Sequence, residues 1–98
     1  MRLAVAQMRR WVDGERAWLA AHPIEGCYES AGRKFAGAID TMSTSADWFG
    51  AIAEASAAPS DDVSLPSART EAGQSLQDAG RALLDAAALA KVARTTCR

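Results

Sequence analysis

The stretch FAGAIDTMSTSADWFGAIA, residues 35–53, decides the fold. Its apolar residues recur in steps of four and three, and at about 100° per residue this spacing places them on one face of an α-helix. Such a heptad seam predicts packing against another helix. We therefore expect a long helix over residues 30–58, with Ser30 as its N-cap. The seam consists of Phe35, Ile39, Met42, Ala46, Phe49 and Ala53.

Two further helices are predicted on either side of this stretch. Residues 2–21 form the first, which ends at His22-Pro23 because the residue before proline avoids the α region. A break at Asp13-Gly14 is the alternative, since Asp-Gly favours a hairpin turn. A third helix over residues 67–95, capped by Ser67, follows a turn-rich connection at residues 59–66. Its expected seam is Ala72, Leu76, Ala79, Leu83, Ala86, Ala90, Ala93 and Cys97.

The composition supports the same architecture. Of the 98 residues 23 are alanine, the best helix former, and Val, Ile, Tyr and Phe together number ten, too few to fill several strands. The length suits one domain over residues 1–98. We expect an all-α fold, a compact bundle of three main antiparallel helices. The first helix is expected to contribute five apolar residues to the core of the bundle: Met8, Trp11, Val12, Trp18 and Leu19.

Charge, hydropathy and motif content exclude several classes of protein. The net charge of -1 argues against a nucleic-acid binder, and no apolar run is long enough to span a membrane. The residues suggest no metal site, no cofactor and no catalytic motif. The first residues do not resemble a secretory signal, so a cytoplasmic protein is expected. Cys27 and Cys97 are then expected to be reduced thiols, although whether they meet stays open.

Charged residues repeat every seven positions in two helices. Asp40, Asp47 and Glu54 form an acidic stripe, and residues 35–66 contain no basic residue. Arginines with the same spacing in the first helix, Arg2, Arg9 and Arg16, would share a register with these acids in an antiparallel hairpin. The helical wheel argues against such pairing, because it places the stripe about 120° from the seam. Two interpretations remain: a solvated face, or a docking face for a basic partner surface.

Apolar residues outside the seams offer further candidate contacts. Trp48 lies about 140° from the seam of its helix. It is either part of the core, with the second helix central, or an exposed anchor for a partner. Leu84, Leu89 and Val92 also point away from their seam, so they are either exposed singly or packed on a second copy or a partner.

Two short patterns resemble known families. Trp48-Phe49-Gly50 resembles the Trp-x-Gly of the WXG100 family, which implies a secreted dimer of helical hairpins with this motif between its two long helices. The carboxy-terminal Tyr-x-x-x-Asp/Glu signal of that family is absent, since Tyr28 is the only tyrosine. Arg16 and His22 have the Arg-x5-His spacing of helical HEPN ribonucleases, which implies RNA cleavage at a dimer interface.

The hypothesis favoured by the sequence is a non-enzymatic protein-binding module. It would act as an adaptor or inhibitor on a larger protein partner, in the manner of phage- or plasmid-borne inhibitors of the anti-CRISPR type, and a homodimer is compatible with this role. A WXG100-like secreted dimer and a HEPN-like ribonuclease are the alternatives. The expected partner-binding residues are Asp40, Asp47, Glu54, Trp48, Leu84, Leu89 and Val92.

Overall fold

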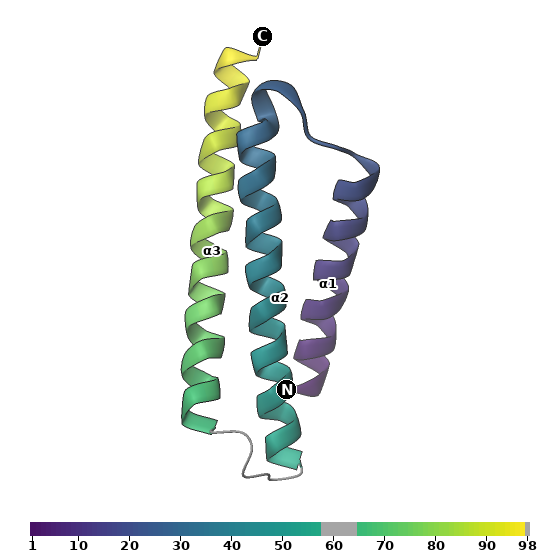
Figure 1. Cartoon of the computed structure of the whole chain (residues 1–98), viewed down its shortest axis with the longest axis vertical. Coiled ribbons are helices and arrows are strands. Elements are labelled where there is room, and N and C mark those ends of the chain that lie inside the picture. Colours follow the sequence, from purple (N-terminus) through teal and green to yellow (C-terminus); the bar gives the residue numbers. More distant parts are fainter. Residues whose placement is uncertain (58–64, 98) are drawn as a thin grey trace.

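The described residues form three long helices (Figure 1). The structure, a computed structural model, describes residues 1–57 and 65–97. Helix α1 spans Arg2–Ala21, α2 spans Glu29–Ala57 and α3 spans Leu65–Thr96, while a single 3-10 turn, η1, covers Gly26–Tyr28. The described residues contain no strand and measure 56 × 24 × 18 Å. The all-α prediction is confirmed, and each helix end lies within two residues of its predicted position.

The helix ends follow local sequence chemistry. Helix α1 runs unbroken through Gly14 and stops where predicted, before His22-Pro23. Gly26 adopts φ +69°, a left-handed conformation that suits glycine, and this turns the chain into η1. Helices α2 and α3 begin before the predicted caps, so Ser30 and Ser67 lie inside the first turns. Residues 59–64 of the predicted connection lie outside the described residues.

Helix α2 is the central element. Helices α1 and α3 both pack against it, and within the described residues they do not pack against each other (Figure 1). Two buried seven-residue repeats on α2 explain this arrangement. Ala46 and Ala53, continuing the line of Ile39, lie beside α1. The second repeat faces α3 and consists of Ala31, Ala38, Ser45 and Ile52.

The seam of α3 is built from small side chains. Ala72, Ala79, Ala86 and Ala93 recur every seven residues and are buried, which lets the two helix backbones approach closely. The approach is close enough for the buried Ser45 hydroxyl of α2 to donate a hydrogen bond of 3.2 Å to the carbonyl oxygen of Ala72. The predicted seam is confirmed at these alanines. It is wrong at Leu76, which lies at the exposed edge of the helix.

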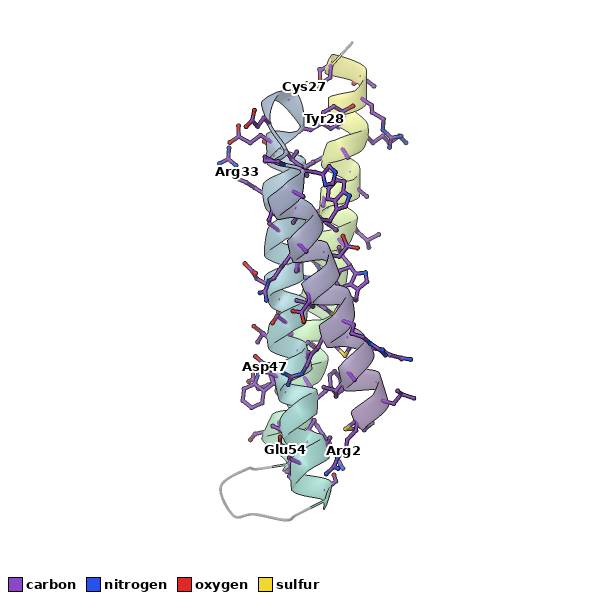
Figure 2. The ribbon with its side chains drawn as sticks, turned by 90° about the vertical axis from the view of Figure 1, so that its right-hand side faces the viewer. Arg2, Cys27, Tyr28, Arg33, Asp47 and Glu54 are labelled. Atoms are coloured by element: carbon purple, nitrogen blue, oxygen red, sulfur yellow. A yellow bond between two sulfur atoms is a disulfide. The ribbon has the colours of Figure 1, made fainter. Side chains whose placement is uncertain are left out.

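A disulfide joins Cys27 to Cys97, with 6.1 Å between the two Cα atoms. Figure 2 shows Cys27 at the end of the molecule where α3 finishes. The expectation of two reduced thiols is therefore wrong. The antiparallel arrangement brings the turn before α2 to the end of α3, so cysteines 70 residues apart in sequence become neighbours.

Helix α1 buries few of its residues against the rest of the structure. Val5 and Val12 are its buried residues, and both face α2. Trp11 is 37% exposed and Trp18 is 50% exposed, so the prediction that both belong to the core is wrong. The reason is architectural. The tryptophans occupy the flank of the apolar arc, and no second helix packs against α1 among the described residues to cover that flank.

Candidate functional site

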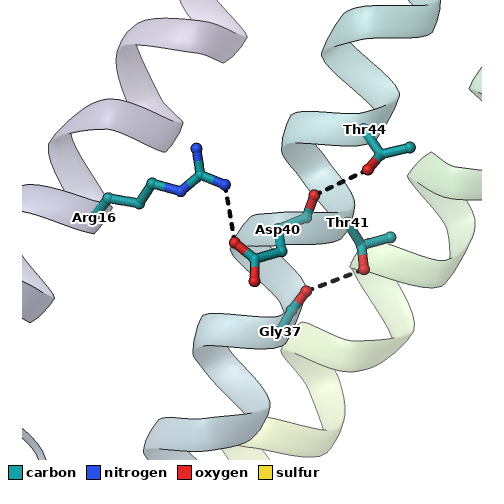
Figure 3. A network of polar contacts seen from close by, with 5 residues as sticks. All are labelled: Arg16, Gly37, Asp40, Thr41 and Thr44. Carbon is teal, nitrogen blue, oxygen red and sulfur yellow. Dashed lines mark hydrogen bonds and ion pairs between the residues drawn. The ribbon is translucent and has the colours of Figure 1, made fainter.

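The acidic stripe of α2 lies along the α1 interface. Arg16 donates a hydrogen bond of 2.9 Å from Nη2 to Oδ1 of Asp40 (Figure 3), and Arg9 Nη2 lies 3.6 Å from Asp47 Oδ1. At the N-terminal end of α1, Arg2 and Glu54 line one hollow (Figure 2). The acids are exposed, as expected. The inference that they would not meet the arginines of the first helix is wrong.

Small residues of α2 explain why the prediction from the helical wheel, that the acids and arginines would not pair, was wrong. Helix α1 does not sit squarely over the seam of residues 35–53 but is displaced toward the acids, over Ser43, Ala46 and Gly50. A Cβ atom at Gly50 would lie 2.9 Å from Arg9 Nη2, so the missing side chain leaves room for the guanidinium. Long arginine side chains then reach the exposed carboxylates. These exposed pairs contribute little stability but leave the acids less available to a partner.

Trp48 packs toward α3. It is half-buried, and it contacts the buried cluster of Ile52, Ala68 and Ala72. This position agrees with the interpretation in which the second helix is central and Trp48 belongs to its packing. A large part of the indole is therefore already engaged within the chain.

The predicted ridge on α3 is open to solvent. Leu84 is 74% exposed, Val92 is 62% exposed and Leu89 is 40% exposed. Of the predicted contact residues, these three are the large apolar side chains that the chain leaves most exposed. Asp85 beside them lies 3.7 Å from Lys34 of α2, measured between Oδ2 and Nζ, so its charge is balanced within the chain.

The residues behind the two family resemblances have other partners. Trp48-Phe49-Gly50 lies inside the continuous helix α2, whereas the WXG100 motif is expected between two helices. Arg16 is held by Asp40. The His22 ring stacks on Trp18 at a centroid distance of 4.6 Å, and its Nδ1 lies 3.0 Å from the Trp18 carbonyl oxygen.

Sequence reasoning missed two features at the end of the molecule where α2 begins. One is the disulfide, and the other is an apolar cavity beside it, lined by residues of four segments. The cavity joins the predicted seam residues Phe35 and Leu83 to Ile24 and Tyr28, which the sequence placed only in a loop. Gly32, one turn before Phe35, was the available signal, since glycine permits another group to approach the helix backbone closely.

Within the described part of the chain, no helix has the length and hydropathy needed to cross a membrane, and no group of three or more His, Cys, Asp or Glu side chains could hold a metal ion. No family model matches the chain, and no curated protein or solved structure shows significant similarity to it.

Proposed function

We propose that this protein is a non-enzymatic binding module that docks on a larger protein, as an adaptor or an inhibitor does. The observation that carries the proposal is the exposed ridge of Leu84, Leu89 and Val92 on α3. A partner that covers these exposed apolar side chains removes them from water, which favours association. The docking mode is a helix laid into an apolar groove of the partner.

The ridge replaces the acidic stripe as the principal contact. Asp40 and Asp47 already have arginine partners, and Trp48 is half-buried. A partner that used the stripe would have to compete with Arg9 and Arg16. A partner that used the ridge would meet uncharged side chains, which hold no ion pair to displace. The proposed partner therefore offers an apolar surface, and a strongly basic one is not required.

The disulfide supports action in an oxidising compartment. Disulfides persist in secreted, periplasmic and surface proteins and are rare in the reducing cytosol. We therefore place the proposed docking outside the reducing cytosol. Binding experiments should accordingly use extracts prepared without reductant, so that Cys27 and Cys97 remain joined.

The test is capture of a partner by the tagged, oxidised protein and by two variants of the ridge, Leu84→Asp and Val92→Asp. Both positions are exposed, so the fold should be retained. Gln77→Glu is the matched control, because it adds the same charge at an exposed site two turns before Leu84 on the same helix. We expect each ridge variant to lose at least about tenfold in affinity, since burying an unpaired carboxylate is costly.

Salt distinguishes the ridge from the acidic stripe. At 1 M salt the Debye length falls to about 3 Å, so a complex built on exposed charges dissociates while an apolar one persists. A stoichiometric partner that survives 1 M salt and is lost in both ridge variants supports the proposal. Binding that is unchanged in both variants, or that disappears in high salt, overturns it.

A further inference from the structure

We propose that the cavity between the start of α2 and the last third of α3 binds a small, uncharged, apolar molecule. The cavity has a volume of about 330 Å³. It is open to solvent, and four bulky side chains from four segments line it: Ile24 from the loop after α1, Tyr28 from η1, Phe35 from α2 and Leu83 from α3. This site is independent of the ridge and of the proposed docking function.

The hollow exists because small residues separate the bulky ones. Ala31 and Gly32 of α2 and Ala86 of α3 are buried at the cavity, and they carry at most a methyl group, which does not fill it. Gly32 also seats Ile24, because a Cβ atom at Gly32 would lie 2.8 Å from the Ile24 Cβ. The wall formed by the loop after α1 therefore depends on the absence of a side chain at Gly32.

The lining decides the chemistry of the ligand. None of the residues around the cavity is charged, and the Tyr28 hydroxyl is their one polar side-chain group. An ion entering such a site would lose its hydration without gaining a partner. An apolar molecule would instead gain by leaving water.

The volume of the cavity limits the size of the ligand. A cavity of about 150 Å³ lined by Leu, Ile and Phe binds benzene. The cavity here is about twice as large and, unlike that enclosed one, is open to solvent, so it suits two fused aromatic rings or an aliphatic group of similar bulk that stays partly exposed. It also lies at the lower end of the range for small-molecule sites, about 300–1,000 Å³.

The disulfide fixes one wall of the cavity in place. Cys27 precedes Tyr28 in η1, and its bond to Cys97 ties this turn to the end of α3 (Figure 2). A wall that is held before the ligand arrives need not be ordered on binding, which lowers the cost of association.

The chain offers a direct reporter for the test. It contains three isoleucines, of which Ile24 lines the cavity while Ile39 and Ile52 are buried along α2, outside the cavity lining. Naphthalene would be titrated into oxidised protein carrying labelled isoleucine δ1 methyl groups and followed by NMR. We expect a saturable shift of the Ile24 methyl signal, with the other two signals unmoved. Charged 2-naphthoate should bind at least about tenfold more weakly.

Ala87→Phe is the variant that fills the cavity. Ala87 lines it and is exposed, so the larger side chain should not disturb folding, which unmoved Ile39 and Ile52 signals would verify. Ala88→Phe is the matched control, being exposed on the same helix outside the lining. We expect at least about a tenfold loss of naphthalene affinity in the first variant and none in the second, because only the first removes the apolar volume.

Three results of the naphthalene titrations would overturn the proposal. They are a shift that does not saturate, a shift of equal size in all three isoleucine signals, and naphthalene binding by Ala87→Phe that equals that of the unchanged protein. Light scattering on the same samples tests whether a second copy fills the cavity instead. A dimer that Ala87→Phe dissociates would assign the cavity to that contact and also contradict the small-molecule site.

Discussion

The two interfaces of α2 differ in nearly every respect. Its contact with α3 runs along two long helices and contains a repeated alanine seam, a buried serine hydrogen bond and a disulfide at one end. Its contact with α1 buries Val5 and Val12 and is flanked by exposed arginine–aspartate pairs. The first interface buries small side chains along most of its length, whereas the second buries few residues of α1.

This difference shows how one helix can serve two kinds of contact. Buried apolar area supplies most of the stabilisation in proteins, and exposed ion pairs supply little. The α2–α3 hairpin should therefore be the stable unit, with α1 attached to it more weakly. Local opening of α1 should cost less free energy than global unfolding, as is usual for the least buried elements.

The largest expected effect comes from removing the disulfide. Closing a loop of this length stabilises the folded state by about 4 kcal/mol in the chain-entropy treatment. The double variant Cys27→Ser, Cys97→Ser should lose about that much free energy of unfolding, measured by urea denaturation. A loss below about 1 kcal/mol would mean that the α2–α3 interface does not depend on its covalent link.

The next largest effect on stability should distinguish the α2–α3 interface from the α1–α2 interface. Ile52→Ala opens a cavity in the α2–α3 interface and should cost about 3 kcal/mol. Val12→Ala removes less buried surface from the α1–α2 interface and should cost about 1.5 kcal/mol. Hydrogen exchange should accelerate throughout α2 and α3 in the first variant but mainly in α1 in the second. Equal acceleration everywhere in both variants would show that the three helices unfold as one unit.

Two glycines of α2, one in open space and one against Ile24, should respond differently to substitution by alanine. Gly37 has open space around it, so Gly37→Ala should stabilise the helix by up to about 1 kcal/mol. Gly32→Ala places a Cβ against Ile24 and should destabilise by about 1–3 kcal/mol, as overpacking does. Thermal unfolding of both variants measures the difference, and equal shifts of the melting temperature would contradict the seating of Ile24 on Gly32.

The smallest effect is expected at the ion pairs. Arg9→Gln and Arg16→Gln remove exposed contacts and should each cost no more than about 0.5 kcal/mol. The loss should shrink further in high salt, because such charges are screened. Hydrogen exchange of the α1 amides is the sensitive measurement. A cost above about 1.5 kcal/mol would show that these pairs, and not Val5 and Val12, hold α1.

How far the sequence predicted the structure depends on how local each signal was. The helix spans followed from alanine content, heptad spacing and His22-Pro23, all of which act within a few residues. The placement of α1 did not follow, because it depends on small residues such as Ser43 and Gly50 that allow an off-centre approach. The disulfide was missed because its cysteines meet only after the hairpin closes.

The candidate site divides in the same way. Exposure of Leu84, Leu89 and Val92 could be predicted, since residues off a heptad seam point away from the neighbouring helix. The helical wheel argues against the ion pairs of Asp40 and Asp47, because it assumes that each helix faces its neighbour squarely. The cavity depends on four segments meeting, a juxtaposition with no signature along the chain.

The disulfide also determines how the chain would respond to mechanical force. It divides the molecule into a covalent ring of residues 27–97 and a linear tail that carries α1. Tension applied to the two chain ends would pass through the sulfur–sulfur bond and bypass α2 and α3 entirely. Only the tail would lengthen, by at most about 3.6 Å for each of its residues. The bond thus shields the hairpin from stretching and leaves α1 as the part that yields.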